Sequence, residues 1–401
     1  MGRFEGGGPP ETVEYEPTSV KDLLVEMKDT AELLIDLSYS AVLHRSTDVA
    51  REVLELENRM DVLQLRARMS LMLAARNPDE AERLAPVLGV VSGADKVSDA
   101  AGDIAKIVLE EIGLPEAMRG ALSEAVEMLV RGEIHDDSPY AGRTLADIDL
   151  ESETGVRAIA IRRSQEWILN PGPNTTLRAG DVAILRGPEA SISGVHETAT
   201  GKAYEPGEPA EPDVSDLERA VDSIVLMKNL SELAVDLAYG SVLFDTEELA
   251  EEVANLEVEV DALQSRFEAW TLQAAAEADD PVALRGLIHL GVATETISDA
   301  ALEITEGVLR DLDVHPVVEL AVRESDEIIT RTTVEAGSEL EGTAVREGVP
   351  ETAVSTSVLA IRRPDEGWLV GPDLDTTIRE GDVLITKGTR TSAAAFGSLA
   401  E

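Results

Sequence analysis

The spacing of apolar residues changes partway through the chain. Between residues 18 and 112 they recur every three or four positions, which predicts three amphipathic helices of roughly 20 to 30 residues each. One face of the first helix carries Leu23, Met27, Ala31, Leu34, Ser38 and Ala41. A shorter helix is expected over 115–131. Beyond it, short runs rich in Val and Ile, such as VRAIAIRR and DVAILRG, alternate with Gly, Pro and Asn, which predicts strands and turns.

This succession of helices and strands occurs twice. Residues 28–43, KDTAELLIDLSYSAVL, align with residues 228–243, KNLSELAVDLAYGSVL, at an offset of 200. The run AIRR recurs at 160–163 and 360–363. The chain is therefore a tandem duplication of the α+β class, in which each unit is an antiparallel three-helix bundle followed by a small α/β module with a β-hairpin. The expected domains are a disordered tail (1–17), helical domain 1 (18–133), module 1 (134–195), a Pro- and Glu-rich linker (196–214), helical domain 2 (215–333) and module 2 (334–401).

Acidic residues dominate the charge. Asp and Glu number 79 against 34 Lys and Arg, for a formal net charge of -45. Nucleic acid and anionic membrane surfaces are therefore disfavoured as direct partners, because both require clustered cations on the protein. Salt screens the self-repulsion of such a surface, so the composition is typical of a halophile. The apolar share of 43% predicts folded domains rather than a disordered acidic chain.

The residues that catalysis or export would require are missing from the sequence. There is no Cys, and the five His do not recur between the two units, which disfavours a nucleophilic triad and a zinc-type site. No Gly-rich phosphate-binding loop follows a strand. A signal-peptide core and an apolar run long enough to span a membrane are also lacking. We therefore predict a cytoplasmic protein that is not an enzyme and does not insert into the membrane.

Residues 142–187 carry a specific pattern. It runs from G-x-T-L through a strand ending in A-I-x-R, an N-P turn and a T-x-L-x-x-G-D hairpin to a closing strand. This pattern resembles the TrkA-C (RCK-C) module of potassium channel and transporter regulators. The second copy departs from it at the turn, where Gly371 replaces the equivalent of Asn170.

The resemblance to TrkA-C modules implies a small regulatory ligand, such as a nucleotide or c-di-AMP, held where two modules meet. The residues implied as ligand-binding are Ile161, Arg162, Arg163, Asn170, Pro171, Ile361, Arg362, Arg363 and Pro372. Guanidinium groups suit phosphate or carboxylate recognition. The alternative is that these Arg side chains pair with acids of the chain itself, such as Asp365 or Glu366.

Three further features of the modules have simpler interpretations. Trp167 and Trp368 are expected to pack against the hairpin rather than to stack on a base. Gly180 and Gly381 are expected to form the hairpin turns, together with the aspartates that follow them.

Acidic pairs at i and i+4 mark the helical segments. They are Glu57 with Asp61, Asp95 with Asp99, Glu257 with Asp261, and Glu295 with Asp299. These pairs resemble those of PhoU-like proteins, although Asp95 stands where Glu is usual. Two such helices side by side would offer oxygen donors to a divalent metal. The alternative is a solvated acidic surface, because Asp95, Asp99 and Asp103 lie opposite the apolar stripe of their helix.

Alternating PhoU-like and TrkA-C segments resemble haloarchaeal regulators of cation transport. The resemblance implies a regulator of potassium transport that associates with a membrane channel or transporter subunit, and a homodimer is a further expectation. Because each kind of segment occurs twice, the two modules could pair within the chain, and the two bundles could form a six-helix body. The alternatives are a PhoU-like metal-binding regulator of phosphate uptake, a regulator of a magnesium or other divalent-cation transporter, and an acidic scaffold without a ligand.

Overall fold

The structure, a computed structural model, describes most of the chain. The described residues are 18–115, 128–150, 154, 156–164, 166–169, 171–187, 189–204, 215–278, 280–312, 315–325, 327–345, 356–363, 367–370 and 375–400. The expected tail (1–17) and residues 205–214 of the expected linker lie outside these ranges.

Each unit begins with three long helices. In the first unit they are α1 (Val20–His44), α2 (Thr47–Ala74) and α3 (Pro78–Leu109). Polar side chains cap all three: the Ser19 hydroxyl accepts a hydrogen bond from the Asp22 amide, Ser46 caps α2, and Asn77 caps α3 ahead of a proline at its first position. In the second unit they are α8 (Ser215–Phe244), α9 (Glu247–Glu277) and α10 (Arg285–Leu309), with a 3-10 turn at Pro281–Leu284. The three-helix prediction is confirmed for both units.

The prediction of a helix over 115–131 is wrong at its C-terminal end. Residues 128–131 lie in strand β1 (Met128–Glu133), and residues 116–127 are outside the described residues. The second unit has a short helix here, α11 (Pro316–Glu324), followed by strand β5 (Glu327–Thr333). A run such as MLV satisfies a helical or a strand pattern equally well, and only pairing with a distant strand decides between them.

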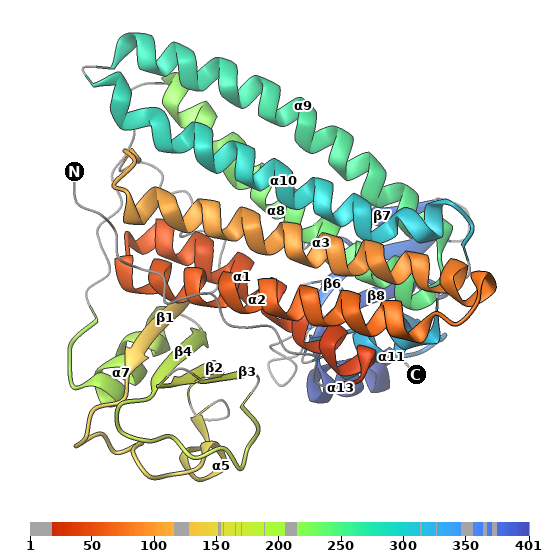
Figure 1. Cartoon of the computed structure of the whole chain (residues 1–401), viewed down its shortest axis with the longest axis horizontal. Coiled ribbons are helices and arrows are strands. Elements are labelled where there is room, and N and C mark those ends of the chain that lie inside the picture. Colours follow the sequence, from red (N-terminus) through yellow and green to blue (C-terminus); the bar gives the residue numbers. More distant parts are fainter. Residues whose placement is uncertain are drawn as a thin grey trace.

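The two bundles form one six-helix body. Helix α3 packs along α10, and buried residues of both bundles belong to one continuous core (Figure 1). The approach of these helices requires glycine: a Cβ at Gly93 would lie 2.8 Å from the Ala300 carbonyl oxygen, and one at Gly307 would lie 2.6 Å from the Cβ of Pro86. The expected six-helix body is therefore present.

Each module is a four-stranded antiparallel sheet. In module 1 the order is β1-β4-β2-β3, with β2 at Arg157–Arg163, β3 at Glu166–Leu169 and β4 at Val182–Gly187. Module 2 repeats this order as β5-β8-β6-β7, with β6 at Thr356–Arg363, β7 at Gly367–Val370 and β8 at Val383–Thr389. Each module contains a β-hairpin, because β2 pairs with β3 and β6 with β7. The expected hairpin at the G-D turns is wrong, because the strands before and after each turn both pair with β2, or with β6, and not with each other. The modules also contain helices α5 (Leu145–Ile148), α7 (Glu189–Thr200) and α13 (Arg390–Ala400).

The elements of module 1 extend beyond the expected bounds of 134–195. Strand β1 precedes residue 134 and pairs with β4 from Met128 opposite Gly187 onward. Helix α7 continues to Thr200, into the segment assigned to the linker. Strand β1 pairs with a strand about fifty residues further along the chain, so no local pattern in the sequence marks it as a strand.

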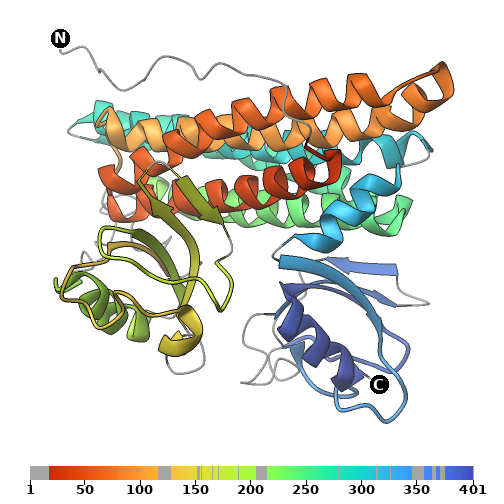
Figure 2. The same ribbon diagram turned by 60° about the horizontal axis from the view of Figure 1, so that its bottom comes forward.

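Each sheet is buried on both faces. Along β2 and β4, Ala160 and Ile184 pack into the helical core, whereas Ile161, Ala183 and Leu185 pack into a second core of the module itself. The period of two in the strand side chains produces this alternation. Figure 2 shows both modules on the same side of the helices, with α7 and α13 on the outer faces of their sheets. Within the described residues the two sheets are separate, so these parts of the modules do not form one continuous sheet.

Candidate functional site

Arg162 docks module 1 onto the helices. Its Nε and Nη2 atoms lie 2.5 and 2.6 Å from the two carboxylate oxygens of Glu52 on α2. The Nε of Arg131, on β1, lies 3.2 Å from the same carboxylate. Only 3% of the Glu52 side chain is exposed, so two guanidinium groups neutralise one buried acid between sheet and helix. The hydrogen bonds to Glu52 raise the pKa of Arg162 further above its usual range.

Arg163 and Arg363 stabilise the G-D turns that precede β4 and β8. Arg163 donates to the Asp181 carboxylate at 2.9 and 2.7 Å and to the Thr176 carbonyl at 2.8 Å. Arg363 makes the equivalent bonds to Asp382, at 3.3 Å, and to the Thr377 carbonyl, at 2.7 Å. Both aspartates are almost fully buried and also accept the backbone amide at the start of their turn. Gly180 and Gly381 complete these turns with φ of 80°.

The other expected ligand residues are spread over several environments. Ile161 and Ile361 are core residues with 0% exposure. Arg362 is 42% exposed, 3.5 Å from Glu248, and lies over the Trp368 ring. Pro171 is partly exposed, and Asn170 and Pro372 lie outside the described residues.

The four candidate Arg side chains therefore have acidic partners within the chain. Asp365 and Glu366, which the sequence suggested as such partners, lie outside the described residues. The partners that the structure places beside the arginines instead come from α2, α9 and the G-D turns. An anionic ligand at these positions would have to displace a carboxylate. Trp167 is 9% exposed and packs into the core between sheet and helices.

The acidic pairs of the first unit come together across α2 and α3. Burial raises the pKa of Glu57 to about 7, and the charges of Asp99, Asp103 and Asp61 raise it further, against the opposing charge of Lys106. Burial also raises the pKa of Asp95 to about 6, helped by Asp99 and Asp61. The Lys106 ammonium lies 3.6 Å from Glu57, so this cluster contains a cation of its own.

The second unit repeats the acidic cluster with a different cation content. Burial raises the pKa of Glu295 to about 7, and Asp299, Asp261 and Glu257 raise it further. The position equivalent to Lys106 is Glu306, so the second cluster lacks that lysine. Across the described residues of both units, no three acidic or His side chains are arranged as a preformed metal site. Asp61, Asp99, Asp261 and Asp299 are exposed, and Glu57, Asp95, Glu257 and Glu295 are half-buried.

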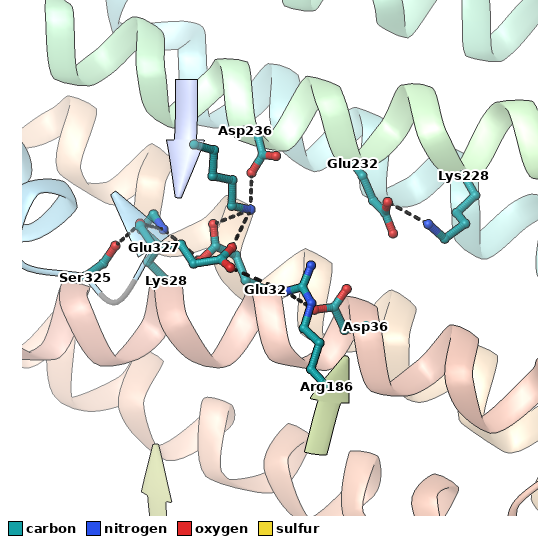
Figure 3. A network of polar contacts seen from close by, with 10 residues as sticks. Lys28, Glu32, Asp36, Arg186, Lys228, Glu232, Asp236, Ser325 and Glu327 are labelled. Carbon is teal, nitrogen blue, oxygen red and sulfur yellow. Dashed lines mark hydrogen bonds and ion pairs between the residues drawn. The ribbon is translucent and has the colours of Figure 1, made fainter. Parts of the chain in front are cut away.

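A second charged site lies where both modules meet the helices, and the sequence reasoning missed it. Helices α1 and α8 carry Lys, Glu and Asp at successive i+4 positions, which are Lys28, Glu32 and Asp36 in α1 and Lys228, Glu232 and Asp236 in α8. Arg186 on β4, Glu327 on β5 and Lys387 on β8 join them (Figure 3). These nine residues are called the junction cluster below. The repeat of K-x-x-x-E-x-x-x-D at the offset of 200 was the signal that could have revealed it.

Lys387 contacts three acids of the junction cluster. Its ammonium lies 2.6 Å from Asp236, 3.2 Å from Glu32 and 3.4 Å from Glu327. These charges outweigh burial and hold the pKa of Lys387 well above its usual range. Burial would raise the pKa of Glu327, but Lys387, Arg186 and Lys28 lower it to about 2. The pKa of Asp36 and that of Asp236 are instead raised to about 6, chiefly by burial.

A cavity of about 380 Å³ lies beside the junction cluster. Residues of α1 line it together with Leu169 of module 1 and Arg390 of module 2. Its lining also includes four carboxylates, from Asp22, Glu26, Asp29 and Glu324. Because acids outnumber the arginine, the cavity is unsuited to a phosphate group.

The architecture defines a class of protein with two helical bundles and two small sheet modules, all carried on one chain. A family model for the PhoU domain matches residues 24–108 and 224–308, and one for the TrkA-C domain matches residues 129–198 and 329–400. These matches cover more than half of the chain and begin the modules within β1 and β5. The chain belongs to the PhoU and TrkA-C domain families, with both domains in tandem duplicate.

Known proteins resemble parts of the chain. The "Probable potassium channel protein 2" of Methanocaldococcus jannaschii is 36% identical over 59 residues, which are 15% of this chain and 17% of that protein. Among solved structures, the crystal structure of the GsuK RCK domain is 15% identical, with coverage of 69% of this chain and 64% of that one and a TM-score of 0.19. The GsuK channel is 14% identical, with coverage of 68% and 52% and a TM-score of 0.19. Such TM-scores support no argument about the fold. None of the described helices has the length and apolarity needed to cross a membrane.

Proposed function

We propose that the protein is a cytoplasmic, non-enzymatic regulator of a cation transport system, with potassium as the transported ion. The proposal is supported by the two TrkA-C domains and by the local similarity to a probable potassium channel protein. In this role the modules bind a small effector, a nucleotide or c-di-AMP, and the helices contact a membrane channel or transporter subunit.

One observation carries the proposal: both modules are attached to the six-helix body by charged side chains. Arg162 fixes module 1 to α2 through Glu52, and Lys387 fixes module 2 to α8 through Asp236. An effector that binds better to one docking geometry than to another would shift the equilibrium between them. The helices would carry that shift to the transport partner.

The test is a ligand screen on the full chain in molar KCl. Thermal unfolding is followed with c-di-AMP, ATP, AMP, NADH, phosphate and divalent metals, and hits are measured by calorimetric titration. A ligand at 100 times its Kd that binds only the folded protein should stabilise it by about 2.7 kcal/mol. Arg362→Gln is the informative variant, because Arg362 is the most exposed of the candidate arginines. Absence of saturable binding by every nucleotide would refute the effector role.

A second candidate function rests on the acidic clusters. Carboxylates from two helices converge in each unit, and the second cluster lacks a lysine at the position of Lys106, although the charge of Lys96 lowers the pKa of its Asp299. This arrangement favours a divalent metal at Glu257, Asp261, Glu295 and Asp299, as in a PhoU-like regulator of phosphate uptake or a regulator of a magnesium transporter. Metal content of protein purified without chelator tests it, with Glu295→Gln as the variant and Glu57→Gln as its counterpart. A folded product without metal, and without affinity for added Mg²⁺ or Mn²⁺, would eliminate this candidate.

A further inference from the structure

Two acids of the junction cluster are shared between the units. Glu327, at the start of β5 in module 2, lies 3.4 Å from Arg186 of module 1 and 3.4 Å from Lys387 of its own module. Glu32, on α1 of the first bundle, lies 2.8 Å from Lys28 and 3.2 Å from Lys387 of the second unit. Each shared carboxylate therefore contacts cations from both halves of the duplication.

The two sheets contribute equivalent cations to these contacts. Arg186 on β4 and Lys387 on β8 each precede a glycine that pairs with the start of β1 or β5. Each reaches the equivalent aspartate of its own unit, with Arg186 3.5 Å from Asp36 and Lys387 2.6 Å from Asp236. Each then continues across the boundary between the units, to Glu327 or Glu32. Module 1 therefore contacts an acid of the second unit and module 2 an acid of the first unit, but the two acids are not at equivalent positions.

Sharing makes the contacts interdependent. The side chains of Glu32, Asp236 and Lys387 are 14, 13 and 17% exposed, so water screens their charges weakly. If module 2 moves away, Lys387 leaves Glu32, and Glu327 leaves Arg186. Arg186 then loses its contact with Glu327 and retains that with Asp36, which weakens the attachment of module 1 to the helices. The same argument holds in the other direction.

We propose that the junction cluster couples the docking of the two modules, so that loosening one module from the helices loosens the other. This proposal extends the regulatory function proposed above and rests on it. An effector that binds one module would then change the position of both modules. The coupling itself is a property of the unliganded chain.

Hydrogen exchange of the full chain, followed by mass spectrometry in molar KCl, tests the coupling. Lys387→Gln removes the cation of module 2, and we expect at least threefold faster exchange in β1 and β4 of module 1 as well as in β8. Arg186→Gln should in turn accelerate exchange in β5 and β8. The matched control is Arg163→Gln, which removes a contact inside module 1, to Asp181, without touching the helices or a shared acid. In this control faster exchange should be confined to module 1.

Two further measurements distinguish loss of docking from global unfolding. Amides of α3 and α10, which form the centre of the six-helix body, report global unfolding, and their exchange should stay unchanged in all variants. If they accelerate, Lys387→Arg, which keeps the charge, must restore the wild-type pattern in module 1. Faster exchange restricted to the mutated module, or no change in either module, would overturn the proposal. Because no ligand is used, this result is independent of whether an effector is found.

Discussion

The two buried tyrosines Tyr39 and Tyr239 offer a matched test of the duplicated core. They occupy equivalent positions in α1 and α8 and are 2 and 1% exposed. The Tyr39 hydroxyl lies 2.7 Å from the Thr294 hydroxyl, which itself donates to the Leu290 carbonyl, so Tyr39 is the donor. The Tyr239 hydroxyl has no hydrogen-bond partner among the described residues. The position equivalent to Thr294 is Ala94, which cannot accept a hydrogen bond.

The magnitudes follow from this difference in bonding. Tyr39→Phe removes a buried hydrogen bond between neutral groups, which should lower the free energy of unfolding by about 1 kcal/mol. Tyr239→Phe removes a buried hydroxyl without a partner, and the relief of its desolvation cost should raise the free energy of unfolding by about 1 kcal/mol. Ala94→Ser should stabilise the wild-type protein, because it places a hydroxyl where Thr294 has one in the other half.

Urea unfolding in molar KCl, followed by far-ultraviolet circular dichroism, measures these differences. The expected separation between the two Tyr→Phe variants is about 2 kcal/mol, the sum of the two effects. In the double variant Tyr239→Phe with Ala94→Ser, the gain from the serine should disappear. Equal destabilisation by both Tyr→Phe changes would refute the reasoning, because it would mean that the two hydroxyls have equivalent partners.

Four other substitutions test the helix packing and the charged contacts. Glu52→Gln leaves Arg131 and Arg162 without their shared carboxylate and should lower the free energy of unfolding, measured with urea, by roughly 3 kcal/mol. Glu55→Gln changes an acid that is 45% exposed and should lower it by under about 1 kcal/mol. Equal losses would contradict the role of Glu52 in holding module 1 to α2. Gly93→Ala places a methyl group 2.8 Å from the Ala300 carbonyl and should destabilise the six-helix body by about 2 kcal/mol, while thermal midpoints unchanged from wild type would argue against this close packing. Burial raises the pKa of Asp36 to about 6, although the charge of Arg186 opposes this shift. The folded state therefore binds the proton more tightly than the unfolded state. The contribution of Asp36 to the free energy of unfolding should rise by about 1 kcal/mol as the pH falls from about 7.5 to about 5. The Asp36→Asn variant should lack this part of the pH profile, and an unchanged profile would show that Asp36 does not titrate in this range.

Much of the fold was readable from local patterns. The period of the apolar residues located three helices in each unit, and the offset of 200 established the duplication. The G-D turns and the strands around AIRR also lie where the sequence placed them. Such features depend on neighbours in the chain, and neighbouring residues are what a sequence pattern records.

The candidate site was less predictable. Arg162 and Arg163 were expected to act together, yet one docks the module on a helix and the other stabilises a turn. Adjacent residues in a strand point to opposite faces, so their partners differ once the sheet is packed on both sides. The convergence of the acidic pairs followed from helix geometry, but only the structure shows that Lys106 lies beside Glu57 in one of the two clusters.

The contacts within the junction cluster could not be predicted from the sequence alone. A Lys, a Glu and an Asp at successive i+4 positions lie on one helix face whatever surrounds them, so the sequence of α1 and α8 determines this arrangement. Their contacts with Arg186, Glu327 and Lys387 bring together residues separated by as many as 355 positions, here Glu32 and Lys387. Burial between sheet and helix, which sets the strength of these contacts, arises only when both modules pack on the same face, because the dielectric environment of a charge belongs to the folded assembly and not to the chain.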